Sequence, residues 1–193
     1  PCGTLFPYTT LFRSPVHSLT AYWHYIARSD EGVHQHAWPY YMRILLFAKY
    51  GPGPWWSEGV IVVLSVIGAI AGIRSRRGAQ RDFVFFLAVY TFCMTLIYTL
   101  IPYKTPWCLL SFLHGMILLA GVGAVAIFTF LPGRILKVMA AALLLLAAAH
   151  LGTQAYRASY VYDTDVRNPY VYSHSVRDVV RLADRVDQMA ALH

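Results

Sequence analysis

The chain has 193 residues, of which 58% are apolar and only 13% are charged, and its mean hydropathy is +0.48. Soluble domains carry about 25% charged residues, so this composition favours a membrane protein. The net charge of +7 arises from basic residues in short patches between apolar runs, which argues against a soluble nucleic-acid binder. The three cysteines predict neither a disulfide framework nor a zinc site.

The chain opens with the stretch TLFPYTTLFRS, from Thr4 to Ser14. This stretch has neither a helical stripe of apolar residues nor the features of a signal peptide. All of its residues match the first-frame translation of a common DNA sequencing-library adapter. We therefore expect residues 1–14 to be an adapter-derived artefact and the biological protein to begin upstream of Pro15.

Residues 15–54 are predicted to form an extracytoplasmic or interfacial segment. Within it, the run YYMRILLFAKY at residues 40–50 is apolar but short, and it carries Arg43 and Lys49. This pattern predicts an interfacial or tilted helix that ends at the sequence GPGP.

Four apolar runs follow, and a transmembrane helix needs about 20 such residues. We therefore predict an all-α polytopic membrane protein with about four transmembrane helices, an interfacial helix and the start of a soluble extracytoplasmic C-terminal region. The bundle occupies residues 55–157, and the predicted spans are residues 55–73, 83–101, 107–131 and 135–156.

The loops between these runs predict the orientation of the bundle. Four arginines lie in RSRRGAQR at residues 74–81, and the turn PGRILK adds Arg134 and Lys137 on the same side. The positive-inside rule makes that side cytoplasmic. We thus predict a bacterial or archaeal cytoplasmic membrane protein whose loop PYKTPW, at residues 102–107, and C-terminus are extracytoplasmic.

Polar and small residues inside the spans predict helix packing rather than chemistry. Thr91, Thr95 and Tyr98 form a stripe at helical spacing, and such stripes are mostly packing contacts. Close helix approach is predicted at Gly115, Gly121 and Gly123. His150 and Gln154 end the last span, and no role is predicted for them.

Residues 158–193 are predicted to begin a soluble extracytoplasmic region that continues beyond the end of this sequence. YVYDTDVRNPYVYSHS is strand-like, with a turn at Asn168-Pro169. Ser175 and Asp178 then form a capping-box pattern ahead of an amphipathic helix.

Three motifs together resemble a known family: EGVHQHAWPYYM, YGPGPWWSE and LIPYKTPWCLLSFLHGMILLAGVGA, supported by RNPYVYSHSVRDVVRL. They are similar to the flippase-activity-associated family of archaeal and bacterial surface glycosylation. That family is related to the GT-C glycosyltransferases, such as protein mannosyltransferases and lipid A aminoarabinose transferases. The resemblance covers residues 15–193, the C-terminal part of such a protein.

The resemblance implies transfer of a sugar from a polyprenyl-phosphate carrier at the outer membrane face. The catalytic acid of GT-C enzymes lies in the first outer loop, which is absent here, so we do not assign that role to Asp30 or Glu31. No cofactor is expected in this fragment beyond the polyprenyl-phosphate sugar as donor, and a divalent metal is left open. The implied partners are the lipid bilayer, the lipid-linked sugar and glycan-export or flippase proteins, without nucleic acid.

Lys104 is the strongest candidate for binding the phosphate of a lipid carrier. It is the only charge between two long apolar spans, and Pro102 and Pro106 stiffen its loop. An ammonium group there can meet a phosphate, and Tyr103 and Trp107 complete the predicted lipid-phosphate site. The alternative is a lysine that snorkels to lipid headgroups.

A second group of residues predicts a sugar or acceptor cavity. His34 and His36 would form its polar lip, although two solvated loop histidines explain the motif equally well. The sequence offers no third or fourth ligand at a spacing typical of a metal site, so a metal is not predicted. Trp38, Tyr40 and Tyr41 could stack on a sugar ring or form an interfacial belt. His114 is predicted to face the bundle or a cavity, or to be a neutral histidine satisfied by a neighbouring helix.

Two functions remain open at this point. One is a glycosyltransferase-like protein that handles polyprenyl-phosphate-linked sugars, and the other is a non-catalytic membrane scaffold that assists flipping or export of those sugars. A transporter would instead predict broken helices with paired charges in mid-membrane. The only ionisable groups well inside these spans are histidines, and the polar residues cluster at one face, so we favour chemistry or binding at the outer surface over a transporter.

Overall fold

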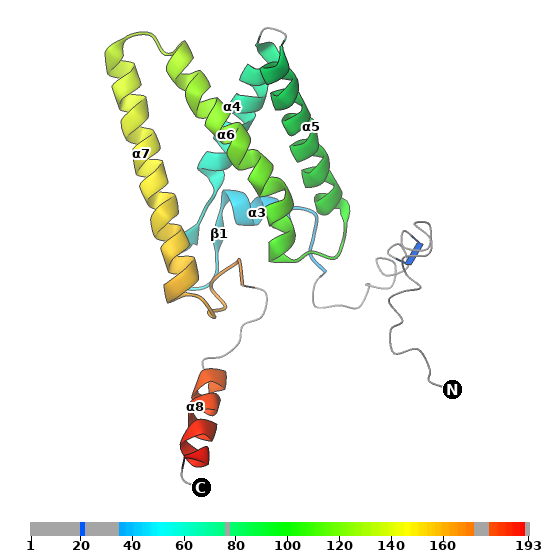
Figure 1. Ribbon diagram of the computed structural model, residues 1–193, viewed down its shortest axis with the longest axis vertical. Helices are drawn as coiled ribbons and strands as arrows, with labels where there is room; N and C mark the ends of the chain where they lie inside the picture. The colour runs from blue at the N-terminus through cyan, green and yellow to red at the C-terminus, as the bar shows by residue number, and fades with distance from the viewer. Residues whose placement is uncertain (1–19, 22–34, 76–77, 172–177, 192–193) are drawn as a thin grey trace.

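The computed structural model describes residues 20–21, 35–75, 78–171 and 178–191. Four longer helices form a bundle (Figure 1): α4 (Gly59–Arg74), α5 (Ala79–Leu100), α6 (Leu110–Phe130) and α7 (Arg134–Tyr156). The shorter elements are α3 (Tyr40–Leu46), β1 (Ala48–Lys49), β2 (Trp55–Trp56), the 3-10 helix η2 (Pro106–Leu109), the π-helix η3 (Arg157–Val161) and α8 (Asp178–Ala190).

The four longer helices alternate in direction, so the connections gather at two ends of the bundle (Figure 1). We call one end the basic end, because it carries Arg74, Arg81 and Arg134. The other is the hairpin end, which comprises α3, the β1–β2 hairpin, the loop at residues 101–105 and the segment at residues 157–171. The described residues with predicted binding roles, apart from His114, lie at the hairpin end.

Three helical segments are long and apolar enough to cross a membrane: Ala79–Leu100, Pro106–Phe130 and Arg134–Val161. Their outer faces are apolar, with Phe92 67% and Leu145 71% exposed. Water penalises exposed apolar surface of this extent, whereas lipid does not. The structure therefore confirms a helical, membrane-embedded protein and three of the four predicted spans.

The first predicted span, residues 55–73, is wrong in its length. Trp55 and Trp56 pair with Lys49 and Ala48 as an antiparallel hairpin, and α4 begins only at Gly59. Its 16 residues extend about 24 Å, which is less than the hydrocarbon thickness of about 30 Å. Adjacent tryptophans suit a strand as well as a helix, and pairing with β1 decides between them.

The predicted interfacial helix at residues 40–50 is also shorter than expected, because α3 ends at Leu46 and β1 follows. Tyr41, Ile44 and Leu45 are fully buried and pack with Phe112 of α6 in one apolar cluster. Their spacing of three and four residues places them on one face of α3. This helix is thus a core element rather than a surface one.

The close approach of α4 to α6 forms the centre of the bundle. A Cβ atom added at Gly68 would overlap the Leu119 carbonyl oxygen, and one at Gly123 would overlap the Leu64 carbonyl oxygen. The close approach predicted at Gly115 and Gly123 is therefore confirmed. Small residues at such crossings let helix backbones pack directly in membranes.

The close approach predicted at Gly121 is wrong. A Cβ atom at Gly121 would meet nothing within 4 Å, because this residue lies on the exposed side of α6. The predicted packing stripe is confirmed at Thr91, whose side chain faces Gly115 and whose Oγ1 donates to the Leu87 carbonyl at 2.7 Å.

The segment after α7 differs from the predicted strand. Tyr160 and Val161 belong to η3, and turns follow as far as Tyr170. The turn at Asn168-Pro169 is confirmed, since Asn168 Nδ2 donates to the carbonyl oxygens of Ala158 and Tyr162, both at 2.9 Å. One buried side chain thereby holds this segment against the end of η3.

The predicted C-terminal helix is confirmed as α8 (Asp178–Ala190), while Ser175 lies outside the described residues. Leu182, Val186 and Met189 follow one another at helical spacing and are exposed. Within the described chain α8 therefore leaves its apolar stripe uncovered.

Substitution at Gly123 tests the α4–α6 crossing. Gly123→Ala should destabilise the protein by about 1–3 kcal/mol, the usual cost of overpacking, because the new methyl group would displace the backbone at Leu64. Gly121→Ala is the control and should change stability by at most about 1 kcal/mol, towards stabilisation. Thermal unfolding of the full chain in detergent micelles measures both, and equal shifts in Tm would contradict the crossing.

Candidate functional site

The structure brings two of the sequence motifs together at the hairpin end. Gln35 forms an antiparallel bridge with Tyr103, and the His36 amide donates to the Pro102 carbonyl at 3.3 Å. The His36 ring stacks on Tyr40, with 4.1 Å between ring centroids and 13° between planes. The histidine motif and the PYKTPW loop are therefore neighbours, although about 65 residues separate them in the chain.

The predicted aromatic lining divides into exposed and structural residues. Trp38 is 69% exposed, whereas Tyr41 is fully buried, and its hydroxyl donates to the Thr105 carbonyl at 3.2 Å. Burial raises the pKa of Tyr41, so its phenol stays a protonated donor to the loop. Sugar stacking by Tyr41 is excluded in this conformation, because Phe112 packs against its ring in a T-shaped contact.

Tyr40 lies between these extremes. It is half-buried, and burial together with the nearby Tyr50 raises its pKa to about 12. His36, Tyr40, Arg43 and Tyr50 line a small pocket of about 240 Å³ at the foot of α3. His34 lies outside the described residues.

Lys104 is buried, with only 1% of its surface exposed. Its Nζ donates to the Ile101 carbonyl, and burial lowers the pKa of the ammonium group. Among the described residues no carboxylate forms an ion pair with it. The snorkelling alternative is therefore wrong, and a phosphate could reach this ammonium only if the loop at residues 101–105 opened.

Trp107 belongs to η2, and His114 lies farther along the same helical segment, in α6. Trp107 is half exposed and lines an apolar groove beside α6. His114 is exposed on α6 and lines none of the described pockets. The prediction that His114 faces a cavity is therefore wrong in this structure, because the helix turns it outward.

No metal site is present in the part of the chain that the structure describes, where no three His, Cys, Asp or Glu side chains come together. The two cysteines of that part, Cys93 and Cys108, are free thiols.

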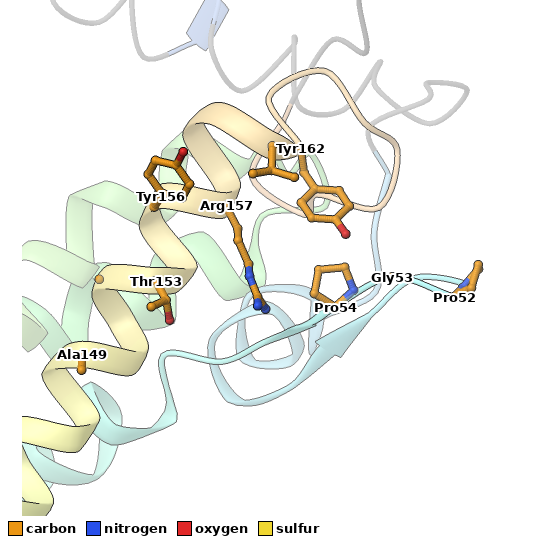
Figure 2. A pocket seen from close by; sticks show the side chains of 10 residues that line it. Pro52, Gly53, Pro54, Ala149, Thr153, Tyr156, Arg157 and Tyr162 are labelled. Atoms are coloured by element: carbon orange, nitrogen blue, oxygen red, sulfur yellow. The ribbon is translucent and has the colours of Figure 1, made fainter.

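An open pocket of about 720 Å³ was not predicted from the sequence (Figure 2). We call it the Arg157 pocket. Thr153 and Tyr156 at the end of α7 form one wall, and the hairpin turn with Pro54 forms another. Figure 2 shows the Arg157 side chain extending from the helix end towards that turn, with Tyr162 on the same rim.

Arg157 is the charged residue among those that line this pocket, and the nearby Arg167 lies over the lining residue Tyr162. Arg167 is already paired, since its Nη2 lies 2.6 Å from Asp165 Oδ2 and its guanidinium lies 5.0 Å from the Tyr162 ring centroid. No described carboxylate pairs with Arg157, and none lines this pocket. The pocket therefore combines an available guanidinium with tyrosine rings, which suits an anionic ligand with a sugar-like face.

The other feature that the sequence did not reveal is the contact of Gln154 and Glu58. Gln154 is 5% exposed, and its Nε2 donates to Glu58 Oε1 at 2.8 Å. A glutamate that opens an apolar run and a glutamine that closes another were the available signals. Only the tertiary structure, which brings the start of α4 to the end of α7, shows that they meet.

Comparisons with protein-family models, curated proteins and solved structures find no match for this chain.

The buried Lys104 generates a pH prediction. Because its pKa is lower in the folded state than its ordinary value of 10.5, the folded protein binds fewer protons and gains stability as pH rises towards that value. Lys104→Met removes this titration, so wild type should become more stable relative to the variant between neutral pH and pH near 10. Unfolding in detergent at several pH values measures the difference. A constant difference would show that the ammonium group is not desolvated.

Proposed function

We propose that this chain is part of a membrane glycosyltransferase-like protein that handles polyprenyl-phosphate-linked sugars at the hairpin end. The Arg157 pocket is the observation that carries the proposal, because it joins a guanidinium to two tyrosine rings at the end of a membrane helix. A guanidinium binds phosphate oxygens through paired hydrogen bonds, and aromatic faces contact the apolar side of sugar rings.

The position of this pocket supports a ligand that is anchored in lipid. Arg157 follows the last residue of α7, a helix whose apolar side chains are exposed along its length. The phosphate of a polyprenyl carrier lies at the membrane surface, at the level where such a helix ends. In this proposal Arg157 replaces Lys104 as the first phosphate contact, and the loop with Lys104 and Tyr103 supports the neighbouring His36 and Tyr40.

The sugar-bearing side would then include the exposed Trp38 and the His36–Tyr40 stack. The donor is a polyprenyl-phosphate sugar, and glycan-export or flippase proteins are the proposed partners. The hairpin end faces the outside of a bacterial or archaeal cytoplasmic membrane, because the arginines of the basic end follow the positive-inside rule.

Substitution of Arg157 tests the proposed phosphate contact. Arg157→Gln should weaken binding of a short-chain polyprenyl phosphate by about ten- to a hundredfold, the usual effect of losing one hydrogen bond to a charged group. Arg157→Lys should keep part of the affinity, and Arg134→Gln at the basic end should keep all of it. Equilibrium binding in nanodiscs measures each variant, and equal affinities for Arg157→Gln and Arg134→Gln would contradict the proposal.

A sugar-transfer assay on a protein that contains this chain separates an enzyme from a scaffold. Transfer of the sugar from the lipid donor to an acceptor, or to water, would support the glycosyltransferase. Binding without turnover, in a longer protein that includes the upstream sequence, would support the scaffold that assists flipping or export.

Labelling of single cysteines tests the orientation. In a chain without its native cysteines, Trp38→Cys lies on an exposed hairpin-end residue and Ser75→Cys lies on an exposed residue at the basic end. We expect an impermeant maleimide to label the first in intact cells and the second only after permeabilisation. The reverse pattern would place the hairpin end in the cytoplasm.

A further inference from the structure

A second cavity lies on the opposite side of α7 from the Arg157 pocket. It is an apolar groove of about 460 Å³ between α4, α6 and α7, and we call it the α6–α7 groove. Its walls include Ile61 of α4, Ile117 of α6 and Leu151 of α7. No residue lines both cavities, and α7 separates them. The volume lies in the range that holds a small organic ligand.

One end of the groove is polar, and its polar groups are held by one another. Glu58 Oε1 accepts hydrogen bonds from Gln154 Nε2 at 2.8 Å and from the Tyr170 hydroxyl at 3.1 Å. Gln154 Oε1 in turn accepts from the Ser57 amide at 2.8 Å. These contacts join residues about 100 positions apart in the chain, so the carboxylate has a defined position before any ligand binds.

The network satisfies only one of the two carboxylate oxygens of Glu58. Within the described residues no donor bonds to Oε2, while Glu58 lines the groove. Burial and the nearby Glu58 carboxylate raise the pKa of Tyr170. Its phenol therefore stays protonated and donates to Glu58 Oε1. Glu58 is partly exposed, so Oε2 remains accessible to a hydrogen-bond donor that enters the groove.

We propose that the α6–α7 groove binds a lipid with a single apolar chain and a head group that is not anionic and donates a hydrogen bond to Glu58. The apolar walls take the chain, and the carboxylate at the polar end selects the head. Charge complementarity decides this choice of occupant, because a phosphate placed beside Glu58 would be repelled. The site is thus chemically opposite to the Arg157 pocket, and the inference does not depend on the proposed function.

Two ligands with the same tail test the head-group selection. Farnesylamine and farnesyl phosphate share one isoprenoid chain and differ in the charge and donor capacity of the head. Binding of each is measured with the full chain in zwitterionic nanodiscs, with empty nanodiscs subtracted. Ile117→Trp fills the groove. Leu118→Trp is the matched control, because Leu118 is about as exposed as Ile117 but lines no described pocket.

We expect Ile117→Trp to weaken farnesylamine binding by about tenfold or more, which corresponds to about 1.4 kcal/mol, and Leu118→Trp to leave it unchanged. Farnesyl phosphate should be insensitive to both variants. Glu58→Gln should also weaken farnesylamine binding by about tenfold, since it removes the charge but keeps an acceptor oxygen. Asp82→Asn, at the basic end, should have no effect.

Two results would overturn the inference. One is equal sensitivity of farnesylamine binding to Ile117→Trp and Leu118→Trp, which would mean that the groove is not occupied. The other is farnesyl phosphate binding that is lost in Ile117→Trp and unchanged in Glu58→Gln, which would mean that the groove holds an anionic lipid. The second result would not contradict the proposed handling of polyprenyl phosphates. Conversely, if Arg157→Gln did not weaken polyprenyl-phosphate binding, the proposed function would fail while the inference about the α6–α7 groove would stand.

Discussion

Helix α7 is joined to the rest of the bundle through a single buried side chain among the described residues, that of Gln154. Its apolar side chains face outward, and its contact with α6 is sparse. Gln154 bonds to both Ser57 and Glu58 at the start of α4, so a polar contact holds this span against the bundle. In lipid, where apolar burial offers little driving force between helices, such polar contacts and close packing are what remain.

The Arg157 pocket and the α6–α7 groove both follow from that attachment. Because α7 is held at its hairpin end and its contact with α6 is sparse, an apolar groove remains between the two helices. The end of α7 and η3 meanwhile lie against the hairpin turn and enclose the Arg157 pocket. The position of Gln154 therefore controls an apolar site with a carboxylate on one side of α7 and an open cationic site on the other.

The tight half of the bundle has a different physical basis. Gly68 and Gly123 let α4 and α6 meet backbone to backbone, and α3 packs Tyr41 and Leu45 into the apolar cluster at their hairpin ends. This packing explains why Lys104 is buried, since its loop is fastened by the Tyr41 hydroxyl and by the bridge between Gln35 and Tyr103. A lone lysine between two spans is accordingly part of the folded core of the loop, whereas Arg157 at the end of α7 is exposed.

The sequence alone determined the membrane character, the three long spans, the amphipathic α8 and the turn at Asn168, because hydrophobic length, helical periodicity and turn chemistry are local properties. Only the tertiary structure decided which residues are accessible. Tyr40 and Tyr41 are adjacent in sequence, yet one lines a pocket and the other is core, since successive helical residues differ in direction by about 100°. Glu58 and Gln154 are almost 100 positions apart, and their contact depends on the fold bringing the start of α4 to the end of α7, which no local pattern encodes.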